Sequence, residues 1–331
     1  MNIAFAAANE LVARIFRPEH LERLRKIGNV KLFPYADYPR PAEVAELLGD
    51  TGAEVAITAW GSPAFDEAIL QRAPRLKLIA HAAGSVKPLV TPGLLGREIR
   101  ICSANDALAR GVAETTLGLT IVSLKNIWQL SADTRSGRWE ENRGKVRELY
   151  GVTVGIVGIG ACGAQYAKLL QPFDVRLLVY DPFVGEAEIA ALGGRKVGLE
   201  QLLREADVVS IHAPSLPETN GMFNASTLGL MKDDAILINT ARGSLIDEPA
   251  LAAELAKGRL WACLDVTEPE PPEPNHPFRT LPNVTLVPHI AGATNNGLQR
   301  MGDYVVTELE LYAAGKPLQG EVDLQQLHTT A

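Results

Sequence analysis

The sequence predicts an α/β protein built from two units, each a doubly wound parallel sheet covered by helices. Short apolar runs alternate with helical patterns along almost the whole chain, and the series runs through twice. A chain of 331 residues has room for about two domains. A glycine-rich turn, GIVGIGACG at 155–163, lies close to the middle of the chain. The residues before that turn are therefore expected to form a unit of their own.

Composition and charge exclude several classes of protein. The apolar fraction of 47% with 21% charged residues is ordinary for a soluble globular chain. The net charge of −7, without a basic run, disfavours nucleic-acid binding. The longest apolar runs, such as LGLTIVSL at 117–124, are too short to span a bilayer. The N-terminus has no Lys or Arg before its apolar stretch, so we interpret it as a first strand rather than a signal peptide.

The cysteines favour a reducing location. Cys102, Cys162 and Cys263 show neither a CxxC motif nor metal-ligand spacing, and their odd number provides no disulfide framework. We therefore expect a cytoplasmic protein without a bound metal.

The first third of the chain contains the elements of one sheet. The predicted strands are 2–7, 54–60, 76–80 and 99–103, with a weaker one at 30–33. Two helices, at 18–27 and 41–48, start with a proline, as helices often do. A helix at 106–126 is apolar nearly all round, which is typical of a helix buried between units.

The second half repeats this pattern. The predicted strands are 152–158, 175–180, 207–212, 235–239, 262–266 and 284–288. A last helix is predicted from Leu298, Met301, Val305 and Leu309, and it should stop at Gly315. The segment EPEPPEPNHP at 268–277, here called the proline loop, must be extended and stiff. We expect it to carry site residues, because the strands on either side look the most buried of this half.

The glycine-rich turn has the spacing of a dinucleotide-binding fingerprint, with Gly158, Gly160 and Gly163 between a strand and a helix. The helix N-terminus would offer its N–H groups to the phosphates. Asp181 ends the next strand about 20 residues on, where a carboxylate accepts from the ribose hydroxyls. It would also repel a 2′-phosphate, which favours NAD(H) over NADP(H). The alternative for Asp181 is a turn residue before Pro182.

Three polar side chains follow later strands, where ligands bind in open α/β sheets: Arg242, Glu270 and His289. Each could be an ordinary surface residue. Together they are the set that hydride transfer to a 2-keto acid requires. A guanidinium grips a carboxylate, an imidazolium donates a proton to the ketone oxygen, and a carboxylate orients that imidazole.

The chain resembles the D-isomer-specific 2-hydroxyacid dehydrogenases, and its glyoxylate/hydroxypyruvate reductase-like branch is favoured. The resemblance rests on ELYGVTVGIVGIGACG, DVVSIHAPSLPETNGMFN, INTARGSLIDEPALAAEL and LDVTEPEP…LVPHIAGAT, in that order. It implies a Rossmann NAD-binding domain (106–294) inserted into a flavodoxin-like substrate-binding domain (1–105 and 295–331). It further implies an active site in the cleft between the two lobes, and a homodimer formed through the inserted domain.

The resemblance also implies roles for single residues. Arg242 matches the arginine that binds the substrate carboxylate and carbonyl, and Glu270 and His289 match the acid/base pair. The implied cofactor-binding residues are Gly158, Gly160, Ala161, Cys162, Gly163, Asp181, His212, Ala213, Pro214, Thr219, Thr240, Ala241, Asp265, Ala291 and Gly292. The implied substrate-binding residues are Ala82, Ala83, Gly84, Arg242 and His289. The chain departs from the family's usual residues at Ala161–Cys162 and in the turn AAGSVK.

The sequence leaves several alternatives open. Cys162, at a helix N-terminus, could have a lowered thiol pKa and a redox role, or be a small apolar filler. His81 could approach substrate, whereas His20, His276 and His328 are expected at the surface. A non-catalytic nicotinamide-sensing module of the corepressor type and a phosphite-type dehydrogenase are the competing functions. The substrate, the direction of the reaction and the strictness for NAD are not predicted.

Overall fold

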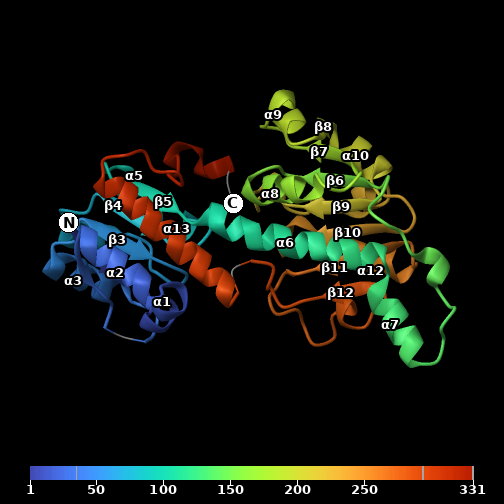
Figure 1. Ribbon diagram of the computed structural model, residues 1–331, viewed down its shortest axis with the longest axis horizontal. Coiled ribbons are helices and arrows are strands. Elements are labelled where there is room, and N and C mark those ends of the chain that lie inside the picture. Colours follow the sequence, from blue (N-terminus) through green and yellow to red (C-terminus); the bar gives the residue numbers. More distant parts are fainter. Residues whose placement is uncertain (35, 293, 330–331) are drawn as a thin grey trace. The chain divides into compact units, whose positions relative to one another are not determined.

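The computed structural model describes residues 1–34, 36–292 and 294–329, which form two compact units (Figure 1). Unit 1 contains Met1–Leu108 and the C-terminal helix α13 (Asn296–Ala313), and unit 2 is Ala109–Gly292. The boundary falls inside the long helix α6 (Asn105–Leu124). The predicted boundaries, at 105/106 and 294/295, lie beside these. Which unit binds substrate and which binds cofactor stays a prediction.

Unit 1 has a five-stranded parallel sheet in the order β2-β1-β3-β4-β5, which is the flavodoxin-like order. Its strands are β1 (Asn2–Phe5), β2 (Asn29–Lys31), β3 (Val55–Thr58), β4 (Leu78–His81) and β5 (Arg100–Ser103). Each predicted strand is present, including the weaker one. Side chains alternate between two cores: Ile3 and Phe5 lie on one face, and Ala4 lies on the other.

Helices cover both faces of this sheet. They are α1 (Asn9–Ile15), α2 (Pro18–Ile27), α3 (Pro41–Thr51), α4 (Glu67–Arg72), α5 (Pro92–Leu95) and α13. Helices α1, α2 and α13 bury Ile15, Leu24 and Met301 against one face, and α3 and α4 bury Leu48 and Ile69 against the other. The apolar spacing in α13 is confirmed, since all four predicted residues are buried.

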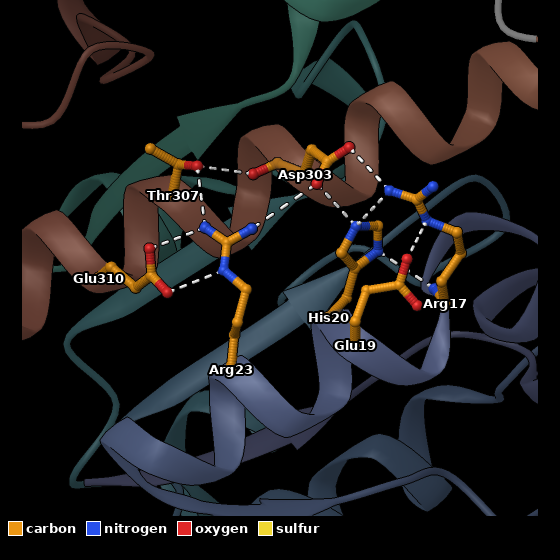
Figure 2. Close-up of polar contacts among 7 residues, drawn as sticks. All are labelled: Arg17, Glu19, His20, Arg23, Asp303, Thr307 and Glu310. Carbon is orange, nitrogen blue, oxygen red and sulfur yellow. Dashed lines mark hydrogen bonds and ion pairs between the residues drawn. The ribbon is translucent and has the colours of Figure 1, made fainter.

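Helix α13 is also tied to α2 by a polar network (Figure 2). Arg23 binds Glu310 through two hydrogen bonds, of 2.9 and 2.7 Å, and donates to Thr307 at 3.3 Å. The Nε2 atom of His20 lies 2.8 Å from Oδ1 of Asp303. The expectation that His20 is at the surface is wrong, because its side chain is wholly buried where α2 packs on α13. The side chain of His328 lies outside the described part.

Unit 2 has a seven-stranded parallel sheet in the order β12-β11-β10-β9-β6-β7-β8. Its strands are β6 (Thr153–Val157), β7 (Arg176–Tyr180), β8 (Gly194–Lys196), β9 (Val208–Ile211), β10 (Ala235–Asn239), β11 (Leu260–Leu264) and β12 (Val284–Leu286). In chain order this is the Rossmann arrangement 3-2-1-4-5-6 with a seventh strand added. The predicted α/β class with two parallel sheets is therefore confirmed.

The helices of unit 2 lie on both faces of its sheet. Apart from α6, they are α7 (Ile127–Arg135), α8 (Ala161–Leu170), α9 (Glu186–Ala191), α10 (Leu199–Glu205), α11 (Ala225–Leu228) and α12 (Glu248–Ala256). Helix α6 is long and apolar enough to cross a membrane. Yet Thr116 and Thr120 on it hydrogen-bond to Thr240 and Tyr166 of unit 2, at 3.1 and 2.7 Å. Those contacts are typical of a core helix.

Strand β8, helix α7 and strand β12 differ from what the sequence predicts. Strand β8 was not predicted, because it is a three-residue polar edge strand without an apolar run. Helix α7 was not predicted either, because only Asp133 is buried along it and its apolar pattern is weak. Strand β12 is only half-buried, so the expectation that both strands beside the proline loop are deeply buried is wrong for β12.

Candidate functional site

The glycine-rich turn connects β6 to α8 in unit 2. Gly158 has φ +90°, and a Cβ there would lie 2.7 Å from the backbone nitrogen of Ala213. A Cβ on Gly163 would lie 2.2 Å from the carbonyl oxygen of Gly158, so α8 packs directly on the turn. At Gly160 a Cβ would meet no atom of the described residues within 4 Å. Two glycines thus serve packing, and the third faces open space at the N-terminus of α8, beside Ala161 and Cys162.

Asp181 lies at the end of β7 and is 8% exposed. Its Oδ2 atom accepts from the N–H of Ile159, in the glycine turn, at 2.9 Å. Its Oδ1 atom accepts from the N–H groups of Phe183 and Val184 at 2.9 and 3.1 Å. The Asp181 carboxylate is therefore held against the glycine turn. It also accepts hydrogen bonds from the turn that follows β7, as the alternative interpretation predicts.

The segment after β9 carries four predicted cofactor residues. Nε2 of His212 lies 2.9 Å from the Ser210 hydroxyl, while its buried Nδ1 has no hydrogen-bond partner within the described ranges. Burial lowers the pKa of His212 to about 4, so its ring is neutral at neutral pH. The hydroxyl of Thr219 donates to the carbonyl of Pro214 at 2.6 Å and so closes the loop that begins at Ala213.

The next two strand ends hold Arg242 and the proline loop. Asn239, the last residue of β10, accepts from the N–H of Ala241 at 3.0 Å and donates to the carbonyl of Arg242 at 2.8 Å. A Cβ on Gly243 would lie 2.1 Å from the carbonyl carbon of Thr267. The backbone beside Arg242 thus touches the backbone at the start of the proline loop.

Glu270 and His289 meet as predicted from the strand order. They follow β11 and β12, which are neighbours in the sheet. Nδ1 of His289 lies 2.7 Å from Oε2 of Glu270, and the two side chains are 50% and 39% exposed. Because the carboxylate accepts a hydrogen bond from Nδ1–H, Nε2 is the nitrogen left for a ligand.

The backbone at His289 is held in an unusual conformation. Its φ is +50°, which is uncommon outside glycine and gathers at functional sites. The buried Asp265 accepts from the N–H groups of Ile290 and Ala291 at 2.6 and 2.9 Å, and its own carbonyl accepts from the N–H of His289 at 2.8 Å. Burial raises the pKa of Asp265, against the effect of these N–H donors. Asp265 therefore orients His289 by holding the chain around it.

A pocket of about 550 Å³ in unit 2 opens beside this pair. Its lining includes Asp265, Glu270, Pro272, Arg279 and His289. Such a volume is in the range of small-molecule sites. The pocket, the imidazole and the carboxylate together form a candidate acid/base site.

Arg242 is exposed and does not join this pair in the described residues. Its Nη1 atom donates to the carbonyl of Ala241 at 2.6 Å. The structure therefore brings together two of the three predicted catalytic side chains and leaves the guanidinium at the end of the neighbouring strand β10.

The predicted substrate residues Ala82, Ala83 and Gly84 follow β4 in unit 1. Ser103 holds this turn by donating to the carbonyls of Ala83 and Gly84 at 3.0 and 2.5 Å. His81 is 3% exposed, and its Nδ1 lies 2.9 Å from the Thr58 hydroxyl. Burial lowers the pKa of His81 to about 4, so the ring is neutral and structural in this unit.

Two residues that shape the site are not among the predicted site residues. Asn239 organises the turn at Arg242, and its place at the last position of a strand is a signal that could have been used. Glu248, at the start of α12, stands out in the sequence only as part of a family motif. The expectation that His276 is at the surface is wrong, because its side chain is 16% exposed and contacts Glu248.

Comparisons with known proteins agree with this geometry. Residues 117–291 match the family model described as "D-isomer specific 2-hydroxyacid dehydrogenase, NAD binding domain". A glyoxylate reductase of Thermofilum pendens is 34% identical over 90% of this chain and 89% of its own length. A D-3-phosphoglycerate dehydrogenase of Methanocaldococcus jannaschii is 31% identical over 96% of this chain. The chain spans only 60% of the length of that relative.

The same relationship is seen in solved structures. The TT0316 protein of Thermus thermophilus superposes with a TM-score of 0.76 and 32% identity, over 98% of this chain and all of that one. The segment that matches the family model contains the glycine turn, Asp181 and the Glu270–His289 pair. The chain belongs to the D-isomer-specific 2-hydroxyacid dehydrogenase family.

Proposed function

We propose that the protein reduces a small 2-keto acid to a D-2-hydroxy acid with NAD(H), and catalyses the reverse reaction. The observation that carries this proposal is the 2.7 Å contact between His289 and Glu270 beside a pocket in the NAD-binding unit. A reductase of 2-keto acids needs a proton donor next to the ketone oxygen, and an imidazolium paired with a carboxylate is such a donor. The glyoxylate reductase among the relatives favours a small substrate.

The residues of unit 2 fit a dinucleotide. Gly160 leaves open space at the N-terminus of α8, where unpaired N–H groups attract phosphate, and Asp181 stands at the end of the next strand. A carboxylate at this place accepts from ribose hydroxyls and disfavours a 2′-phosphate, so we propose NAD(H) as the preferred cofactor. The other predicted cofactor residues, from His212 to Gly292, follow strands β9 to β12 in the chain.

The chemistry that a reduced nicotinamide supplies when bound is a hydride for C2 of the substrate. Nε2 of His289 donates the proton to the substrate oxygen, and Glu270 keeps the ring oriented and stabilises its charged form. Arg242 is free to swing from the carbonyl of Ala241 onto the substrate carboxylate, which it would hold in a bidentate manner. The substrate contacts predicted for Ala82, Ala83 and Gly84 stay a prediction.

A matched pair of glycine variants separates cofactor binding from folding. Gly163→Ala places a methyl group 2.2 Å from a carbonyl oxygen, so it should lower the melting temperature. In Gly160→Ala the methyl group has no neighbour within 4 Å among the residues that the structure describes, so the variant should fold normally. It should bind NADH more weakly, because the methyl group enters the space proposed for the pyrophosphate. Thermal unfolding and fluorescence titration with NADH measure both effects. Unchanged NADH affinity in Gly160→Ala would contradict this placement.

A spectrophotometric screen tests the function. Glyoxylate, hydroxypyruvate and pyruvate are each added to the protein with NADH or with NADPH, and the loss of absorbance of the reduced cofactor is followed. We expect turnover of at least one keto acid, with NADH preferred. Binding of NADH without turnover of any 2-keto acid would instead favour a nicotinamide-sensing module. NADH formation from NAD and phosphite would favour a phosphite-type dehydrogenase.

We also propose a homodimer formed through unit 2. Large apolar side chains are exposed along α7 and the segment after it: Ile127, Trp128, Trp139, Val146 and Tyr150. Exposed apolar side chains of this size are typical of protein–protein contacts. Light scattering should give twice the chain mass, and Trp128→Asp with Trp139→Asp should give the monomer mass. A monomeric wild-type protein would rule this out.

A further inference from the structure

A second histidine–carboxylate pair lies at the base of the proline loop. Glu248 is the first residue of α12, and its side chain is 9% exposed. One of its oxygens, Oε1, accepts from the backbone N–H of Glu268 at 2.9 Å. The other, Oε2, lies 3.0 Å from Nε2 of His276. A single buried carboxylate therefore contacts both ends of the loop that carries Glu270.

The contacts of His276 define which ring nitrogen carries the proton. Nδ1 accepts from the N–H of Phe278 at 3.3 Å, so Nε2 is the donor to Glu248. The imidazole also packs edge-on against the Phe278 ring, with 4.5 Å between centroids. Phe278 is 2% exposed and belongs to the core of unit 2. The end of the loop is thus connected through His276 to both the core and α12.

Burying a carboxylate is costly unless both oxygens find donors. Burial raises the pKa of Glu248, while the N–H of Glu268 and the His276 ring act in the opposite direction and favour the ionised form. Both oxygens of Glu248 have donors, and both of these donors belong to the proline loop. The Glu248 carboxylate therefore holds the proline loop by hydrogen bonds at both of its ends.

Residues that flank the proline loop donate further hydrogen bonds to its backbone. The hydroxyl of Thr267 donates to the carbonyl of Pro269 at 2.8 Å. Arg279 donates to the carbonyls of Glu273 and Pro272 at 2.9 and 2.7 Å. Hydrogen bonds thus hold the backbone on both sides of Glu270, so a change at either end of the loop is expected to move the Glu270 carboxylate.

We propose that Glu248 and His276 are positioning residues that place the Glu270 carboxylate against His289. This inference rests on the proposed acid/base role of Glu270 and His289. Neither positioning residue needs to touch substrate or cofactor. They affect the reaction only by holding the two ends of the proline loop, which positions the Glu270 carboxylate.

Two variants each break one part of this arrangement. Glu248→Gln keeps an acceptor for Glu268 but turns an amide NH₂ toward Nε2–H of His276, so two donors face each other. His276→Asn is too short to reach Glu248. The control is Glu254→Gln on the same helix, a carboxylate of similar burial that binds Lys257 and Arg259 at the other end of α12.

Hydrogen exchange and kinetics together test the proposal. We expect faster amide exchange in residues 268–277 for both loop variants but not for Glu254→Gln. We expect kcat to fall by about 10²-fold with unchanged NADH affinity, since a displacement of about 1 Å of a reacting group costs that much. KM for the keto acid should stay close to the wild-type value, because the displaced carboxylate acts on the proton donor and not on substrate binding. The double variant should lose no more than either single variant.

The outcomes separate this inference from the proposed function. Unchanged exchange in 268–277 for Glu248→Gln would show that Glu248 does not hold the loop. Faster exchange with wild-type kcat would overturn the positioning role, as would an equal loss of kcat in Glu254→Gln. If the wild-type protein turns over no 2-keto acid, the proposed function fails, and the exchange result still decides whether these residues hold the loop.

Discussion

The His289→Asn variant should lose about 10²–10⁴-fold in kcat for reduction of the 2-keto acid, because positioned proton transfer contributes that much. Asn preserves a polar side chain at the left-handed backbone position, a conformation that Asn tolerates well. The fold should therefore survive, and the affinity for NADH should be unchanged. Steady-state kinetics and NADH fluorescence titration measure the two quantities.

Glu270→Gln provides the companion measurement. The amide retains an oxygen that can accept from Nδ1–H, yet it removes the negative charge that stabilises the imidazolium. Its kcat should fall less than that of His289→Asn, because the imidazole that donates the proton is still present. Wild-type turnover in His289→Asn would show that His289 is not the proton donor.

The Arg242→Lys variant should lose roughly 10- to 100-fold in kcat/KM for the keto acid, corresponding to the 1.5–3 kcal/mol of a hydrogen bond to a charged group. Lysine keeps the positive charge but loses the planar fork that binds a carboxylate through two parallel hydrogen bonds. Because the proposed contact is to the substrate, NADH affinity should not change.

The matched control for Arg242→Lys is Arg195→Lys, in the edge strand β8 on the other side of the same sheet. Arg195 pairs with Glu205 at the surface, and exposed pairs of this kind contribute little. Its variant should retain wild-type kcat/KM. Equal kcat/KM for Arg242→Lys and the wild-type protein would mean that another group binds the substrate carboxylate.

Much of the fold follows from local patterns in the sequence. Buried parallel strands have continuous apolar runs, so β1, β3, β6 and β10 could be located from these runs alone. Strand β8 could not, because a short edge strand with Arg195 at its centre has no apolar run. The burial of His20 depends on Asp303, nearly three hundred positions away, and no local pattern indicates such a partner.

The site was predictable to a similar extent. The order of parallel strands places residues that follow β11 and β12 at one edge, so the approach of Glu270 to His289 could be expected. The double role of Glu248 could not, because it depends on the path of the proline loop back to α12. The rotamer of Arg242 is likewise set by its neighbours, not by its place in a motif.

We infer that the carboxyl ends of β10, β11 and β12 hold one 2-keto acid between Arg242 and the Glu270–His289 pair. A crystal structure with NADH and oxamate, an unreactive mimic of a 2-keto acid, tests it most directly. We expect Nε2 of His289 and the guanidinium of Arg242 to lie within hydrogen-bonding distance of the same oxamate molecule. Oxamate bound in full occupancy away from both side chains would contradict it.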